Sequence, residues 1–147
     1  MSFAINLAED AYKKNEVPVG AIIVKDDKII GSGHNSVISD CSVSAHAEIN
    51  AINRASRFIK NYRLKGCDMY VTLEPCHMCA KAIVDARLDT LYFGALEPKT
   101  GAIESIDQFL DRGDLNHNVL YSGGHMKEQS ANLLKKFFQS KRLNQSP

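Results

Sequence analysis

The sequence predicts an α/β protein: a three-layer α/β/α sandwich around a central mixed sheet of about five strands. The chain opens with an apolar stripe of helical spacing, followed by two apolar runs around a charged turn, which is the pattern of a β-hairpin. Helical and strand-like segments then alternate along the rest of the chain. With 147 residues it can bury roughly 70% of its unfolded surface, so we expect one domain over residues 1–147.

Apolar spacing and breaker residues place the individual elements. Apolar residues three or four apart indicate the helices, and short β-rich runs bounded by Gly, Pro or Asp indicate the strands. The first strand is apolar along its length, so we expect it to be buried on both faces. In order, we expect a helix over 3–12, strands over 19–24 and 28–33, a polar loop over 35–44, a helix over 46–59, a strand over 68–73, a helix over 75–86, strands over 90–94 and 119–121, and a helix around 131–138.

Composition excludes several classes of protein. No apolar run approaches the roughly 20 residues that a helix needs to span a bilayer, so we expect no membrane-spanning helix. Charged residues stand near the N-terminus where an export signal needs apolar ones. We therefore expect a cytoplasmic protein whose 4 cysteines are metal-bound or free rather than disulfide-paired.

The charge pattern leaves only a local route to nucleic acid. A net charge of +1 gives no general affinity for phosphate. The C-terminal segment is nevertheless basic, with Glu128 opposed by Lys127, Lys135, Lys136, Lys141 and Arg142. Two interpretations are open: a contact surface for nucleic acid, or the solvated face of a helix.

Two short segments carry the residue types of a catalytic zinc site: His46-Ala47-Glu48 and Pro75-Cys76-His77-Met78-Cys79. The imidazole of His46 and the thiols of Cys76 and Cys79 are donors that zinc prefers, and three protein ligands leave a fourth position for water. Both segments lie where a helix is expected to begin, and the positive end of a helix favours thiolate. The carboxylate of Glu48 can then act as general acid and base.

Other interpretations of the cysteines remain open. A C-x-x-C pair also occurs in redox sites and structural zinc ribbons. Cys41 or Cys67 as a fourth ligand would make the zinc structural, and the chain would then be a non-enzymatic RNA-binding module. Histidines that lack ligand spacing or should point off the cysteine face are not counted as ligands: His34, His77, His117 and His125.

At these residues the chain resembles the cytidine/deoxycytidylate deaminase superfamily, whose signature joins H-A-E to a later P-C-x-x-C. Within it, nearly the whole chain is similar to the bacterial tRNA-specific adenosine deaminases. The similar segments are 16–21 (EVPVGA), 45–49 (AHAEI), 61–64 (NYRL), 72–76 (TLEPC), 93–95 (FGA), 98–101 (PKTG), 116–117 (NH) and the closing 137–138 (FF).

The resemblance implies a cytidine deaminase-like fold and a homodimer that converts adenosine to inosine at the wobble position of the tRNA anticodon, mainly in arginine tRNA. It implies that His46, Cys76 and Cys79 hold one zinc ion per subunit and that Glu48 shuttles protons. The residues implied to contact the substrate are Asn35, Ala47, Glu97, Lys99 and Phe137 or Phe138.

The chain departs from the family pattern in two places. It has Ser42-Val43 where the family often has Asp-Pro, and Glu97 where aspartate is common. A deaminase of guanine or of another free base or nucleoside shares both motifs and is the alternative function. The basic C-terminal segment and Lys99-Thr100-Gly101 favour RNA over a free base.

Overall fold

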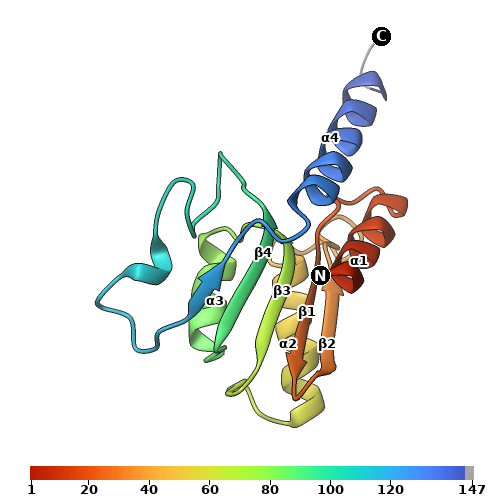
Figure 1. The fold of residues 1–147 in the computed structure, drawn as a ribbon. Helices are drawn as coiled ribbons and strands as arrows, with labels where there is room; N and C mark the ends of the chain where they lie inside the picture. Colours follow the sequence, from red (N-terminus) through yellow and green to blue (C-terminus); the bar gives the residue numbers. More distant parts are fainter. Residues whose placement is uncertain (145–147) are drawn as a thin grey trace.

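A five-stranded mixed sheet with helices on both faces confirms the predicted three-layer fold in the computed structural model, which describes residues 1–144 (Figure 1). The strand order is β2-β1-β3-β4-β5; β1 is antiparallel to β2 and β3, whereas β3, β4 and β5 are parallel. The elements are α1 (Ser2–Lys13), β1 (Gly20–Lys25), β2 (Lys28–His34), α2 (Ala47–Ile59), β3 (Asp68–Leu73), α3 (His77–Asp85), β4 (Thr90–Ala95), η1 (Phe109–Asp111), β5 (Leu120–Ser122) and α4 (Lys127–Asn144). The last three residues of the expected domain lie outside the described part.

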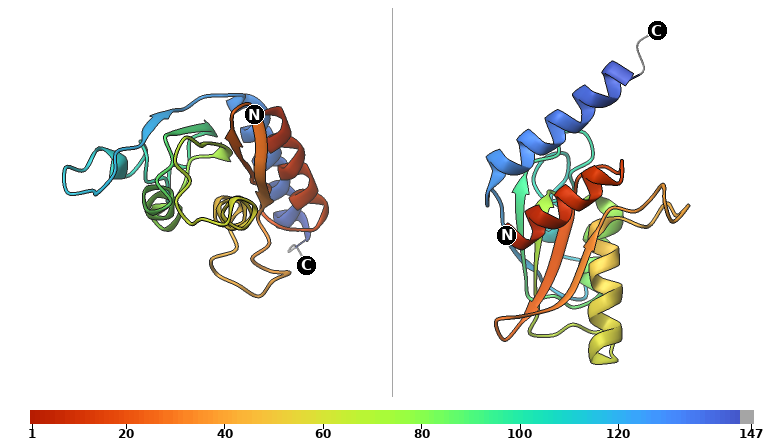
Figure 2. Two further views of the ribbon diagram at one scale, coloured as in Figure 1. Left: turned by 90° about the horizontal axis from the view of Figure 1, so that it is seen from below. Right: turned by 90° about the vertical axis from the view of Figure 1, so that its right-hand side faces the viewer.

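The helices form the two outer layers. α1 and α4 lie on one face of the sheet, and α2 and α3 lie on the other (Figure 2). The main buried cluster joins α2 and α3 to the sheet through side chains such as Ala51, Ile83, Val71 and Phe93. The first four residues of β1 are buried, as expected for a strand covered on both faces.

Two glycines of β2 bring α2 close to the sheet. A Cβ at Gly31 would lie 2.5 Å from the carbonyl oxygen of Ala51, and one at Gly33 would lie 2.7 Å from that of Ala47. No side chain larger than hydrogen fits at either distance without a shift of the helix. This close contact fixes the start of α2, where His46 and Glu48 lie, relative to the sheet.

The sequence-based bounds differ from the structure by a few residues. β3 occupies the predicted residues, β2 and β4 each extend one residue further, and β5 lies one residue later. The helix expected from Pro75 begins instead at His77, because Cys76 is extended (φ −77°, ψ 177°) and forms the N-cap. Within residues 1–144, no helix combines the length and apolar character needed to cross a membrane.

Candidate metal centre and active site

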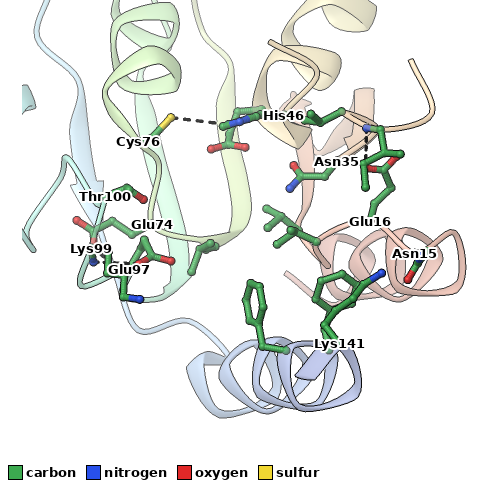
Figure 3. Close-up of a pocket in the computed structure, with 18 of the residues that line it drawn as sticks. Asn15, Glu16, Asn35, His46, Glu74, Cys76, Glu97, Lys99, Thr100 and Lys141 are labelled. Atoms are coloured by element: carbon green, nitrogen blue, oxygen red, sulfur yellow. Dashed lines mark hydrogen bonds between the residues drawn. The ribbon is translucent and has the colours of Figure 1, made fainter. Parts of the chain in front are cut away.

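The N-termini of α2 and α3 meet at one point. His46 is the N-cap of α2 and Cys76 is the N-cap of α3, and both have extended backbone. The side chains of the two N-caps point from the helix ends toward one another (Figure 3). Cys79 follows in the first turn of α3, on the same side as Cys76. The two helices lie on the same face of the sheet, which brings the three side chains together.

The three side chains fit a tetrahedral zinc ion. Nδ1 of His46 lies 3.7 Å from Sγ of Cys76 and 3.5 Å from Sγ of Cys79. Zn–S bonds of about 2.3 Å and Zn–N bonds of about 2.0–2.1 Å at a tetrahedral angle would separate these atoms by about 3.6 Å. The ligand atoms all lie within 4.8 Å of one another. One imidazole and two thiols at this spacing are therefore preorganised for a metal such as zinc.

The neighbours of Cys76 favour its thiolate form, which is the form that binds metal. The hydrogen bond with Cys79 lowers the pKa of Cys76, and the neighbouring imidazole lowers it further. The same pairing raises the pKa of Cys79, because two thiolates this close repel. The bond with Cys76 raises the pKa of His46. A divalent cation would remove this competition and favour both thiolates.

Glu48 lies beside this cluster, in the first turn of α2, with 4% of its surface exposed. Burial raises the pKa of Glu48 to about 6, although the nearby His46 lowers it in part. A carboxyl group with this proton affinity can both accept and return a proton near neutral pH. The structure thus brings Glu48 together with the three candidate metal ligands, as the motif spacing predicted.

A cavity of about 920 Å³ opens from the cluster. Figure 3 shows His46 and Cys76 at one end and Lys141 of α4 at the other, with Glu74, Glu97, Lys99 and Thr100 on one side and Asn15, Glu16 and Asn35 on the opposite side. Its lining includes the predicted contact residues Asn35, Glu97, Lys99, Phe137 and Phe138. Ala47 is buried behind Asn35, and its N–H donates to Oδ1 of Asn35 at 2.8 Å.

The remaining cysteines do not complete a four-ligand site. Cys41 is exposed in the segment 36–45 between β2 and α2, which we call the 36–45 loop, and Cys67 is fully buried in the core. The only group of potential metal ligands found in residues 1–144 is His46, Cys76 and Cys79. A structural zinc with Cys41 or Cys67 as fourth ligand is therefore wrong for this arrangement, and with it the main support for a non-enzymatic module. All four cysteines are free rather than disulfide-bonded.

The other histidines have protein partners. Nε2 of His77 lies 2.8 Å from Asp107, and Nε2 of His117 lies 2.7 Å from the carbonyl oxygen of Leu88. His34 bonds to the carbonyl oxygen of Asn35, and His125 bonds to Ser122. None of the four belongs to the candidate metal-ligand group found in the described chain.

Two buried carboxylates in the cavity wall were not assigned a role from the sequence. Glu16 and Glu74 are each 2% exposed, and each accepts hydrogen bonds from the backbone of a loop that borders the cavity. In the sequence, Glu16 precedes Val17-Pro18, and Glu74 lies between Leu73 and Pro75, so each glutamate stands close to a proline beside an apolar residue. That pattern indicates burial but does not identify the loop that is held.

Comparisons with known proteins agree with this site. A family model described as MafB19-like deaminase matches residues 1–142, which places the chain in the deaminase class. A tRNA-specific adenosine deaminase of Aquifex aeolicus is 43% identical over 144 residues, covering 98% of this chain and 95% of the relative. This chain belongs to the family of the tRNA-specific adenosine deaminases.

Solved structures extend the comparison to the fold. A structure from a study of A-to-I editing by tRNA:A34 deaminases at the wobble position of transfer RNA superposes with a TM-score of 0.89 at 41% identity, covering 91% of this chain and 97% of that chain. A guanine deaminase from Nitrosomonas europaea superposes with a TM-score of 0.76 at 20% identity, covering 92% of this chain and 81% of that chain. At that identity the guanine deaminase shares the fold alone.

Proposed function

We propose that this protein is a zinc-dependent tRNA adenosine deaminase that converts adenosine to inosine at the wobble position of the anticodon, mainly in arginine tRNA. The observation that carries the proposal is the cluster of His46, Cys76 and Cys79 beside the buried Glu48, at the end of a wide cavity. We further propose one deaminase domain over residues 1–147, acting as a homodimer in the cytoplasm.

His46, Cys76 and Cys79 would hold the zinc ion, since their donor atoms and spacing fit it. When bound, zinc supplies a Lewis acid that lowers the pKa of the attacking water. Glu48 takes one proton from this water while the oxygen bonds to C6 of adenine, and gives that proton to N1. It then moves the proton of the new hydroxyl group to the amino group, which leaves as ammonia. Water and adenosine are thereby converted to inosine and ammonia.

The cavity supports an RNA substrate over a free base. Its volume of about 920 Å³ lies near the upper end of the roughly 300–1,000 Å³ typical of small-ligand pockets, so more than one base has room. Phe138 is exposed and offers an aromatic surface on which a base can stack, while the buried Phe137 packs edge-on against it. Lys99 and Lys141 offer positive charge for phosphates. The Oδ1 atom of Asn35 is held by the N–H of Ala47, which leaves the amide nitrogen to donate to the base.

An anticodon loop suits this site because its bases are already unpaired and cost little to extrude. The test is to incubate the zinc-loaded protein with an arginine-tRNA anticodon stem-loop, with free adenosine and with guanine, and to assay ammonia and base identity. We expect inosine in the stem-loop and little turnover of the free compounds. Turnover of guanine alone would overturn the substrate, and absence of turnover with zinc bound would overturn the enzymatic function.

A further inference from the structure

Glu74 lies at the junction between the metal site and one wall of the cavity. It follows directly on Leu73, the last residue of β3, and precedes Pro75 and the proposed ligand Cys76. Its side chain is 2% exposed, and no cationic side chain forms an ion pair with it in the part of the chain that the structure describes. A buried carboxylate in this situation must be stabilised by hydrogen-bond donors.

The donors come from both ends of the segment 97–105, which we call the 97–105 loop. Oε1 of Glu74 accepts from the N–H of Glu97 at 3.0 Å and from the hydroxyl group of Ser105. Oε2 accepts from the N–H groups of Ile103 at 3.0 Å, Glu104 at 2.7 Å and Ser105 at 2.9 Å. Hydrogen bonds to an ionised acceptor are stronger than those between neutral groups. Because the donors lie at both ends of the loop, the Glu74 carboxylate holds these two ends together.

Gly101 lets the loop wrap closely around this carboxylate. A Cβ at Gly101 would lie 2.3 Å from Cδ and Oε1 of Glu74, which leaves no room for a side chain. The N–H of Gly101 donates to the carbonyl oxygen of Glu97 at 2.9 Å, and that of Ala102 donates to Pro75 at 2.9 Å. The loop is thus attached to the segment that carries Cys76.

The loop carries Glu97, Lys99 and Thr100 into the cavity wall (Figure 3). Oε1 of Glu97 accepts from the N–H of Lys99 at 3.0 Å, so the two residues are placed together. The geometry points to Glu74 as a positioning residue for substrate binding: by holding the 97–105 loop, it sets where Glu97 and Lys99 meet the RNA relative to the metal site. This inference rests on the proposed function, and it adds a role for a residue remote from the reacting bond.

Glu74→Gln tests the inference with little change in volume. An amide offers one acceptor oxygen in place of two and adds a donor that opposes the loop N–H groups. We expect KM for the anticodon stem-loop to rise about tenfold or more, because several charge-assisted bonds are lost. We expect kcat to stay within about a factor of three, because the loop supplies binding rather than proton transfer. Metal content should be unchanged.

Hydrogen exchange gives a readout that does not depend on activity. The amide protons of Glu97, Ile103, Glu104 and Ser105 are bonded to Glu74, so their exchange should be faster in Glu74→Gln. Glu104→Gln is the matched control: it makes the same chemical change on an exposed side chain of the same loop, outside the cavity lining. That control should change neither the exchange nor KM.

Gly101→Ala perturbs the same contact from the loop side and keeps Glu74 intact, which covers the case in which Glu74→Gln does not fold. It should raise KM in the same direction, and the double variant should raise it by less than the product of the single effects. Unchanged exchange in the folded variants would overturn the loop attachment. Faster exchange with unchanged KM, or a loss confined to kcat or to metal content, would overturn the role in substrate binding.

Failure of the proposed function would be recognised separately. If the unmodified protein does not deaminate the stem-loop, the proposed reaction is wrong and the substrate role of Glu74 falls with it. The exchange measurement would still decide whether Glu74 holds the loop.

Discussion

A buried glutamate lies at the end of the cavity beside the candidate metal ligands, and another lies in its side wall, but the two differ in how readily they bind a proton. Glu48 at the metal end and Glu74 in the wall are 4% and 2% exposed, yet burial raises the pKa of Glu48 to about 6, whereas that of Glu74 is lowered. Burial also acts to raise the pKa of Glu74, but hydrogen bonds from Glu104 and Ser105 outweigh it. The number of donors, rather than the degree of burial, decides whether a buried carboxylate exchanges protons or anchors the chain.

The opposite wall repeats the anchoring arrangement with fewer bonds. Glu16 accepts from the N–H of Ile38 at 3.1 Å and from the N–H and hydroxyl group of Ser39 at 2.8 Å and 3.0 Å. It therefore holds one point of the 36–45 loop, whereas Glu74 holds both ends of the 97–105 loop. We expect the 36–45 loop to be the more mobile wall of the two.

The largest expected effect is at the proton-exchanging carboxylate. Glu48→Gln should lower kcat by about 10²–10⁴-fold or more, because it removes the group proposed to accept and return protons. Zinc content and thermal stability should stay close to those of the unmodified protein, since Glu48 is not among the metal-ligand group. Steady-state kinetics with metal analysis checks this, and near-normal turnover would contradict the assigned role.

An anchoring carboxylate should instead affect stability. Glu16→Gln should lower the free energy of unfolding by roughly 1–3 kcal/mol, because buried donors lose a charged acceptor. Chemical denaturation measures this effect. Its control is Glu9→Gln on exposed α1 surface, which should have almost no effect. A loss in kcat comparable to that of Glu48→Gln would erase the distinction between the two regions.

Acid should reproduce part of the Glu16→Gln effect. Burial and the nearby Asp40 act to raise the pKa of Glu16, but hydrogen bonds from Ser39 and Ile38 outweigh them, so the net pKa lies below its ordinary value of 4.5. A lowered folded-state pKa contributes stability that is present above 4.5 and is lost as the pH falls through the lower folded-state value. The stability difference between the unmodified protein and Glu16→Gln should shrink over that range. A difference that does not vary with pH would contradict the ionised anchor.

The smallest effect is expected at a single charge on the 97–105 loop. Lys99→Ala should weaken binding of the stem-loop only a few-fold, and should reduce the slope of log affinity against log salt by about one, because one phosphate contact is lost. Binding titrations at several salt concentrations measure the slope. An unchanged slope would mean that Lys99 does not contact a phosphate, and that the 97–105 loop does not bind the RNA through this charge.

Local patterns in the sequence predict the strands of the sheet and the grouping of the three candidate metal ligands. Apolar runs and the turn at Asp26-Asp27 locate the hairpin, and strand β3 matches its predicted residues. The motif spacing of His46, Cys76 and Cys79 identifies candidate ligands whose donor atoms the structure brings within 4.8 Å of one another. The exact start of α3 was less accessible, because an N-cap and a first helical residue differ only in backbone angle.

The roles of Glu16 and Glu74 could not be predicted, for a physical reason. Their partners are backbone N–H groups that every residue other than proline carries, and these groups lie 22 to 31 positions away in the sequence. Side-chain pattern carries no information about such contacts. Only the tertiary path of the two loops reveals these contacts. Sequence motifs therefore identify the groups proposed to react more readily than the groups that position the substrate.

The N-caps of α2 and α3 have one more consequence. Helices ordinarily begin with a Ser, Thr, Asp or Asn side chain that satisfies a free N–H group, whereas here the starting side chains are an imidazole, His46, and a thiol, Cys76, that point toward each other. One metal ion bound by residues of both helices would link the first turn of α2 to the first turn of α3. Chelation should therefore fray the first turns of both helices together, in a single zinc-dependent transition.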